Sequence, residues 1–163
     1  MKLNEYRLLQ IAIKIMVNNS HINPLLTGSL MLSARNIEKR RDAKDIDILV
    51  TDMNLINSID GMEQKTPVYP DSVRYAIGDL HIDFLPYDTE KAETINNVLC
   101  CSVDGMLNAK YRYYIEDKIG TSSKKHYEDL SFMGFMFPEI PVTKNDNIID
   151  DFTLVKIKLY DKW

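Results

Sequence analysis

Hydrophobic positions near the start of the chain recur every three or four residues. They fall at Leu3, Tyr6, Leu9, Ile13, Met16 and Val17. This spacing predicts an amphipathic helix over residues 3–18, and the polar residues 18–20 would end it. A short apolar run at 24–27 then leads to Gly28-Ser29, and residues 30–36 again have helical spacing. The first part of the chain therefore alternates helix, apolar run and helix.

Polar and apolar residues alternate in the segment Asp45-Ile46-Asp47-Ile48-Leu49-Val50, which predicts a strand. Residues 73–77 and 80–85 form a hairpin pattern around the pair Gly78-Asp79, and glycine at the first turn position suits a two-residue type II′ turn. The remaining predicted elements are a helix at 53–59, a buried strand at 98–102, and helices at 104–116 and 123–133, with Ser123 as a candidate N-cap. This interleaving predicts an α/β (α+β) fold, a mixed β-sheet flanked by helices.

The chain has the length of one ordinary domain, and we place this domain at residues 1–138. Residues 139–163 are expected to be a C-terminal extension packed on the same domain. Within it, residues 152–160 fit either a strand or a helix, and the pattern does not decide between them.

Composition places the protein among soluble globular chains, with 45% hydrophobic and 27% charged residues. Cys100 and Cys101 are adjacent and therefore poorly placed for a mutual disulfide, which favours a reducing compartment. Charged residues interrupt every apolar stretch near the start, and no run approaches the length of a membrane span. We therefore expect a cytoplasmic protein with no membrane partner.

The net charge of −4 argues against a broad nucleic-acid-binding surface. Positive charge is nevertheless concentrated in residues 35–44, which hold five cationic and two anionic side chains directly before Asp45. Such a cluster is either a solvated loop or a rim that attracts phosphate. Arg41 and Lys44 are the candidate phosphate contacts.

Asp45 and Asp47 lie two residues apart on one predicted strand, so their side chains share a face. Asp83 has similar apolar neighbours on the second hairpin strand. Aspartate is disfavoured inside strands, so three such residues require a reason. Carboxylate oxygens are ligands for Mg²⁺, and three of them fit a two-metal phosphoryl-transfer site. A D-x-D pair at an exposed strand edge is the structural alternative.

The predicted hairpin register places Arg74 opposite Asp83 if Gly78-Asp79 forms the turn. We expect Arg74 to orient Asp83 or to contact a phosphate. A bulge in the hairpin would turn Arg74 to the other face.

Three segments together resemble the polymerase-β-type nucleotidyltransferase superfamily. They are Leu26-Thr27-Gly28-Ser29, Asp45-Ile46-Asp47-Ile48 and Ile82-Asp83-Phe84, within residues 24–85. The family pattern is an apolar strand, G-S or G-G, a helix, then h-D-h-D-h and a third acidic residue on a later strand.

The resemblance implies that Gly28 and Ser29 hold the triphosphate of a nucleotide. It also implies that Asp45 and Asp47 bind two Mg²⁺ ions, for which Mn²⁺ could substitute, and that Asp83 helps to activate an acceptor hydroxyl.

Further segments are similar to the AbiEii-type toxin nucleotidyltransferases. They are Arg41–Asp47, Leu107–Lys110 and Lys124–Leu130. By this resemblance Lys110 faces the nucleotide phosphates and Asp129 is an additional acidic site residue. The alternatives are an exposed lysine on a helix and an exposed acid beside basic neighbours. The interval from Ser29 to Asp45 is longer than in many superfamily members.

These observations predict a metal-dependent nucleotidyltransferase that moves an NMP from an NTP such as ATP to an acceptor hydroxyl. An RNA 3′ end and a protein side chain are the expected acceptors. A role in toxin–antitoxin or phage-defence systems, with an antitoxin or other partner protein, follows from the resemblance. The alternative function is an inactive nucleotidyltransferase-like module that binds a nucleotide or a protein.

Overall fold

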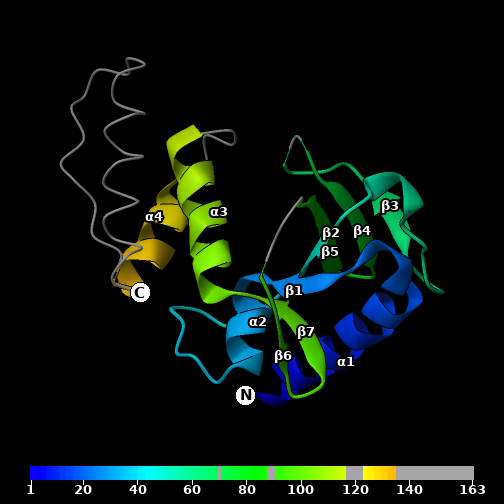
Figure 1. Cartoon of the computed structure of the whole chain (residues 1–163), viewed down its shortest axis with the longest axis horizontal. Coiled ribbons are helices and arrows are strands. Elements are labelled where there is room, and N and C mark those ends of the chain that lie inside the picture. Colours follow the sequence, from blue (N-terminus) through cyan, green and yellow to red (C-terminus); the bar gives the residue numbers. More distant parts are fainter. Residues whose placement is uncertain (70, 88–90, 117–122, 135–163) are drawn as a thin grey trace. The chain divides into compact units, whose positions relative to one another are not determined.

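The computed structural model describes residues 1–69, 71–87, 91–116 and 123–134 of the chain (Figure 1). The chain divides into two compact units, Met1–Met106 and Leu107–Trp163. The first unit holds a mixed sheet with helices, and the described part of the second is helical (Figure 1). The predicted boundary at residue 138 and the extension at 139–163 lie outside the described residues.

The elements follow one another as predicted over most of the chain. In order they are α1 (Leu3–Asn18), the 3₁₀ turn η1 (Ser20–Ile22), β1 (Leu25–Thr27), α2 (Gly28–Ala34), β2 (Ile46–Val50), the 3₁₀ turn η2 (Met53–Leu55), β3 (Glu63–Lys65), β4 (Val73–Ile77), β5 (Leu80–Pro86), β6 (Ala92–Ile95), β7 (Val98–Cys101), α3 (Val103–Glu116) and α4 (Ser123–Phe132). Helix α3 begins in the first unit and continues into the second.

The seven strands form one sheet in the order β3-β4-β5-β2-β1-β7-β6. Strand β2 is parallel to β5, and β1 is parallel to β7, whereas the other neighbouring pairs are antiparallel. The predicted mixed sheet with helices is confirmed.

The predicted alternation along β2 is confirmed by burial. Ile46, Ile48 and Val50 have no exposed surface, and Ile82 and Phe84 of the adjacent β5 are equally buried. Their side chains form one apolar layer, because residues in register on neighbouring strands share a face. Burial of this apolar layer fixes the register of β2 and β5, and the aspartates lie on the opposite face of these strands.

The hairpin of β4 and β5 has the predicted register, with Ile77 paired to Leu80 across the turn. Gly78 has a positive φ of 57°, which the primed hairpin turns require and which glycine adopts readily. No bulge interrupts the five paired positions. The register therefore carries through to the polar residues further along both strands.

Helix α1 has the predicted span, but its buried face differs from the predicted stripe. Leu3 and Tyr6 are exposed, whereas the buried side chains are Glu5, Leu9, Ala12, Ile15 and Met16. Positions 5, 9, 12 and 16 form a continuous helical stripe that begins with a carboxylate. Hydrophobic periodicity alone does not find this stripe, because its first member, Glu5, is polar.

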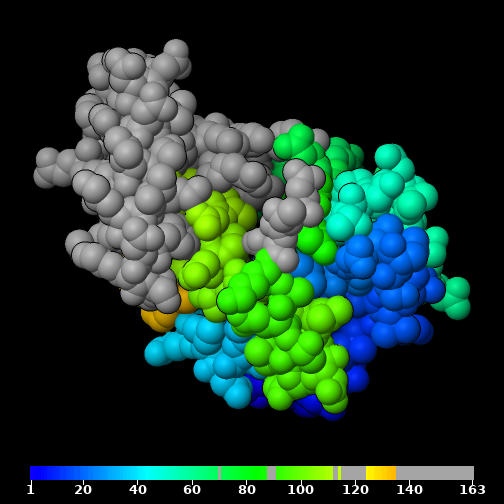
Figure 2. Space-filling model, viewed as in Figure 1, coloured from blue at the N-terminus to red at the C-terminus, as the bar shows by residue number. Residues whose placement is uncertain are grey.

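Two further predictions need correction. The helix predicted at 53–59 is only the 3₁₀ turn Met53–Leu55, and residues 56–59 are not helical. Strands β3 and β6 were not predicted, because both are short edge strands with exposed positions and no apolar run. Residues of β6 and β7 form part of the surface of the first unit on the face drawn in Figure 2.

In the second unit α4 begins at Ser123, close to the predicted boundary. Across the described residues, no helix has the length and apolar character needed to cross a bilayer. The ambiguous segment 152–160 lies outside the described residues.

Candidate active site

A row of polar side chains crosses five adjacent strands of the first unit. Strand pairing places Thr27 beside Asp47, Asp47 beside Asp83, Asp83 beside Arg74, and Arg74 beside Lys65. Residues in register on neighbouring strands share a face, so these side chains line one side of the sheet. Two of the three predicted carboxylates are therefore direct neighbours. The parallel pairing of β2 with β5, which a single strand pattern cannot show, brings them together.

Arg74 binds both oxygens of Asp83, as its predicted position across the hairpin requires. Arg74 Nε donates to Asp83 Oδ1 at 2.7 Å, and a terminal guanidinium nitrogen donates to Oδ2 at 2.6 Å. The side chain of Asp83 is 3% exposed and that of Arg74 is 16% exposed. Bidentate pairing of this kind is strong and fixes the orientation of the carboxylate.

Arg74 also lies in the field of the other two aspartates. Its pKa is raised, first by the hydrogen bonds to Asp83 and further by the charges of Asp83, Asp45 and Asp47, although burial acts in the opposite direction. The guanidinium therefore stays positively charged and balances part of the negative charge of the cluster. We assign Arg74 the role of charge compensation at this site.

Asp45 lies immediately before β2 and next to His81. The distance from His81 Nδ1 to Asp45 Oδ1 is 3.8 Å, and each side chain is 44% exposed. His81 is two residues from Asp83 on β5, so both face the same side of the sheet. Asp45 is thus more accessible than Asp83. We name the three carboxylates Asp45, Asp47 and Asp83 the acidic row. His81, which the sequence analysis did not select, lies beside the candidate site by position.

Gly28 packs directly against the carboxylate of Asp47. Its φ is +69°, and a Cβ added there would collide with Asp47 Oδ2 and lie 3.1 Å from its Cγ. Only glycine leaves room for Asp47 at this junction between β1 and α2. Ser29 follows, partly exposed, and its carbonyl oxygen accepts the Ser33 hydroxyl at 3.2 Å. Gly28 thus borders Asp47, and the contact of Gly28 and Ser29 with phosphate stays a prediction.

Two of the five cations in the basic segment 35–44 make structural contacts, which neither a solvated loop nor a phosphate-attracting rim predicts. Arg35 donates to Glu93 Oε2 at 2.6 Å and to the carbonyl oxygen of Cys101 at 2.7 Å. Lys39 lies 2.7 Å from Glu5 Oε1. Of the two predicted phosphate contacts, Arg41 is half-buried, and Lys44 is exposed and directly precedes Asp45.

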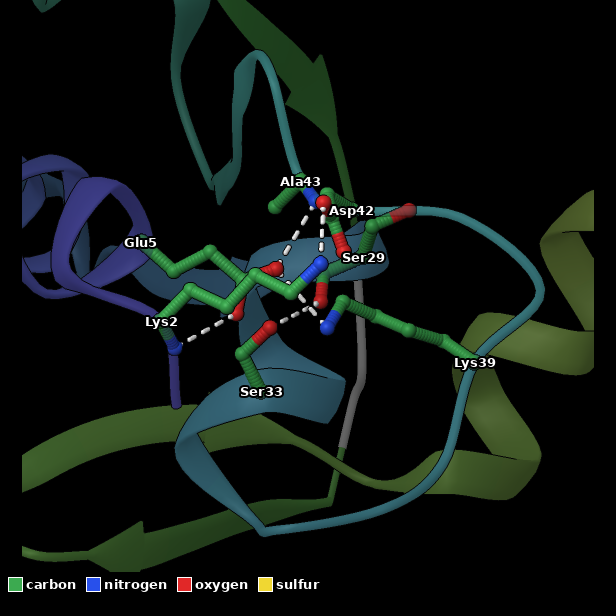
Figure 3. A network of polar contacts seen from close by, with 7 residues as sticks. All are labelled: Lys2, Glu5, Ser29, Ser33, Lys39, Asp42 and Ala43. Atoms are coloured by element: carbon green, nitrogen blue, oxygen red, sulfur yellow. Dashed lines mark hydrogen bonds and ion pairs between the residues drawn. The ribbon is translucent and has the colours of Figure 1, made fainter.

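Glu5 is the buried residue that sequence reasoning missed (Figure 3). Its carboxylate accepts Ala43 N–H at 2.9 Å and Lys2 N–H at 3.3 Å, besides pairing with Lys39. Burial would raise its pKa, but the hydrogen bonds from Lys39, Ala43 and Lys2, with the charge of Lys39, lower it to about 2. The sequence does hold one indication of this burial, because Glu5 has the helical spacing of the buried positions 9, 12 and 16.

In the second unit, Lys110 and Asp129 pair with each other. Lys110 Nζ lies 3.1 Å from Asp129 Oδ2, and their side chains are 14% and 11% exposed. The pair joins α3 to α4. The sequence did not indicate this pairing, and the separate roles expected for Lys110 and Asp129 toward a nucleotide stay predictions.

The chemistry of the first-unit residues fits a magnesium ion bound together with phosphate. Among the described residues, no group of three or more His, Cys, Asp or Glu side chains is arranged to hold a metal ion unaided. Magnesium sites of nucleotide enzymes use one or two carboxylates and complete the shell with phosphate oxygens and water. Asp45 and Asp47 are the candidate pair, and the carboxylate of Asp47 packs directly on the Gly28 backbone.

A separate apolar hollow of about 350 Å³ lies near the start of β1, between the end of α1 and the β6–β7 hairpin. The described residues that line it carry no charge. It offers no catalytic group and is distinct from the acidic row.

The chain folds as a mixed sheet in which the Gly-Ser turn follows β1 and the paired aspartates lie on the adjacent interior strands β2 and β5, and this fold is similar to that of solved nucleotidyltransferases. No family model matches the sequence, and no curated protein matches it. Solved structures do resemble it, at 13–16% identity, and at that level the resemblance concerns the fold alone.

Two of these structures are of the antibiotic-resistance factor ANT(2'')-Ia. Its solution structure has a TM-score of 0.56 and 14% identity, covering 99% of this chain and 94% of that chain. Its crystal structure in complex with adenylyl-2''-tobramycin has a TM-score of 0.55 and 14% identity, covering 98% of both chains. A Thermotoga maritima protein described as a nucleotidyltransferase has a TM-score of 0.50 and 16% identity, covering 78% of this chain and 96% of that chain.

Proposed function

We propose that the protein is a metal-dependent nucleotidyltransferase that transfers an NMP from an NTP to an acceptor hydroxyl and releases pyrophosphate. The observation that carries this proposal is the register of the acidic row. Asp47 and Asp83 are paired across parallel strands, Arg74 holds Asp83, and Gly28 packs on Asp47. The nucleotidyltransferase fold, found independently by structural comparison, supports it.

Asp45 and Asp47 would hold Mg²⁺ or Mn²⁺ together with the triphosphate. When bound, the metal supplies positive charge to the phosphate oxygens and lowers the pKa of a coordinated hydroxyl. The backbone at Gly28 and Ser29 would contact the phosphates, because glycine permits close approach and the serine adds a hydroxyl donor.

Asp83 would accept the hydrogen bond of the attacking hydroxyl, and Arg74 keeps its carboxylate in one orientation. The hydroxyl oxygen attacks the α-phosphorus, the bond to the β-phosphate oxygen breaks, and pyrophosphate leaves. The hydroxyl proton passes to the carboxylate and then to solvent. Arg41 and Lys44, next to Asp45, would stabilise the charge on the departing pyrophosphate.

The acceptor is proposed at the level of chemical class. The AbiEii-type resemblance favours an RNA 3′ end or a protein hydroxyl, with Lys110 and Asp129 serving the nucleotide. The internal pairing of Arg35 and Lys39 removes two cations from the surface that RNA would contact. The complex of ANT(2'')-Ia contains an adenylylated aminoglycoside, so a small-molecule hydroxyl is a third class to test.

The test is incubation with Mg²⁺, each α-labelled NTP and three acceptor pools: total RNA, cell protein and an aminoglycoside panel. We expect label on one pool with the wild type. Asp45→Ala/Asp47→Ala should abolish it, whereas Asp79→Asn, an exposed aspartate in the hairpin turn, should retain it. Nucleotide binding with no transfer to any pool would replace the proposal with the inactive binding module. In that module, neutralising Asp45 and Asp47 should raise stability by relieving repulsion and leave binding intact.

A further inference from the structure

Glu5 joins two parts of the chain that are far apart in sequence. The carboxylate belongs to the first turn of α1, yet its side chain is only 2% exposed. An ionised carboxylate is stable in such surroundings only when charged and hydrogen-bonding partners compensate it. Two of those partners, Lys39 Nζ and Ala43 N–H, come from the loop before β2 (Figure 3).

The two contacts hold the loop at two points, four residues apart. Lys39 is 16% exposed, and Ala43 is buried at 6%. Both reach the same oxygen of Glu5, Oε1. Glu5 therefore fastens the loop segment 39–43 to α1 at two positions, and the exposed pair of Lys2 with Asp42 adds a third contact.

Asp45 lies between this attachment and the sheet. Strand pairing of β2 with β5 begins at Ile46, so Asp45 has no paired position of its own in that ladder. Ala43 is fixed on one side of it and Ile46 on the other. Asp45 therefore lies two residues after the contact between Glu5 and Ala43 and one residue before the paired strand.

We propose that Glu5 is a positioning residue for the active site: it holds loop 39–43 so that Asp45 stays beside Asp47 and Arg41 and Lys44 face the phosphates. This inference rests on the proposed nucleotidyl transfer, since it assigns Asp45 a role with metal and phosphate. It adds a residue outside the acidic row, on a helix that contributes no other group to the site.

The simpler role for Glu5 is to cap helix α1, since its Oε2 accepts Lys2 N–H at 3.3 Å. Capping and loop positioning predict different effects for Lys39, which is not part of α1. If Glu5 only caps the helix, removal of the Lys39 charge changes nothing at the acidic row. If Glu5 positions the loop, loss of Lys39 acts in the same direction as loss of the Glu5 charge.

The experiment compares Glu5→Gln, Lys39→Met and the double variant with wild type. Asp42→Asn is the matched control, because it removes an exposed pair with Lys2 (68% and 51% exposed) from the same loop without touching Glu5. Glutamine keeps an oxygen for Ala43 N–H and removes only the charge, so the fold should survive. Circular dichroism checks this for every variant.

Two readouts are taken. The first is tryptic cleavage after Arg40 and Arg41, sites that all variants retain. The second is affinity for Mn²⁺ with a non-hydrolysable NTP, together with KM and kcat for transfer. We expect Glu5→Gln and Lys39→Met each to speed cleavage and to weaken Mn²⁺–nucleotide binding about tenfold, a loss on the scale of a displaced contact group. The double variant should be no worse than Glu5→Gln, and Asp42→Asn should match wild type.

Normal cleavage and binding in Glu5→Gln, in an active protein, would overturn the inference alone. An effect of Glu5→Gln that Lys39→Met does not share would assign Glu5 to helix capping and overturn it as well. A wild-type protein that neither binds Mn²⁺–nucleotide nor transfers label would overturn the proposed function, and the role given to Asp45 with it. In that case altered proteolysis would report only that Glu5 holds the loop.

Discussion

Replacement of Gly28 by alanine tests whether Asp47 is seated on the backbone of the Gly-Ser turn. Gly28 has φ +69°, and an added Cβ would meet the Asp47 carboxylate well inside contact distance. The left-handed conformation costs alanine about 1–2 kcal/mol. The collision adds an overpacking term of about 1–3 kcal/mol. We therefore expect Gly28→Ala to lower the free energy of unfolding by about 2–5 kcal/mol, the sum of the two terms.

Gly61 provides the matched control for the conformational term. Its φ is +84°, but an added Cβ would find its nearest neighbour, Ile77 Cγ2, at 3.9 Å, an ordinary contact. Gly61→Ala should therefore lose only about 1–2 kcal/mol. Urea denaturation of both variants at one temperature gives the difference, which isolates the contact with Asp47. Under the transfer assay, Gly28→Ala should also lose roughly 100-fold in activity, because Asp47 is displaced, and Gly61→Ala should not.

Equal destabilisation by Gly28→Ala and Gly61→Ala would refute the packing of Gly28 on Asp47. A sharper check is the double variant Gly28→Ala/Asp47→Ala. If the carboxylate is the obstacle, its removal should cost less stability in the Gly28→Ala background than in wild type. Additive losses would show that the two residues do not touch.

Two more predictions concern buried carboxylates. Arg74→Met should lower the free energy of unfolding by about 3–5 kcal/mol, because it leaves Asp83 charged, buried and without its main partner. The double variant Arg74→Met/Asp83→Asn should recover part of this loss. A loss below about 1 kcal/mol in urea denaturation would mean that solvent screens the pair. For Glu5, a pKa lowered from 4.5 to about 2 corresponds to about 3 kcal/mol of stability. This contribution is fully present above pH 4.5 and is lost as the pH falls through about 2. The difference in unfolding free energy between wild type and Glu5→Gln should therefore stay constant above pH 4.5 and shrink between pH 4.5 and about 2. A difference that stays constant down to about pH 2 would contradict this assignment.

The sequence predicted the acidic row well because the information for it is local. Alternation along β2 gave the shared face of Asp45 and Asp47, and the glycine turn gave the pairing of Arg74 with Asp83. Each inference spans fewer than ten residues. The pairing of Asp47 with Asp83 joins strands 36 residues apart and depends on which strands become neighbours, which a single pattern does not specify.

The charged loop shows why the other site contacts were not predicted. Five cations stand between residues 35 and 44, and composition alone treats them as equivalent. In the fold, Arg35 reaches Glu93 and Lys39 reaches Glu5, contacts that span 58 and 34 positions in the sequence. Their partners lie on separate elements, β6 and α1. Nothing near either cation in the sequence indicates these partners.

Arg35 and Lys39 attach different parts of the loop to the rest of the fold. Arg35 fixes its start to the β6–β7 side of the sheet through Glu93 and the carbonyl oxygen of Cys101, and Lys39 fixes its middle to α1. A loop fastened at these points can hold Asp45 in place without the strand pairing that Asp47 and Asp83 have. Because a loop that is already ordered loses less conformational entropy when it binds phosphate, these internal ion pairs would favour binding at the proposed site although they contribute no charge to it.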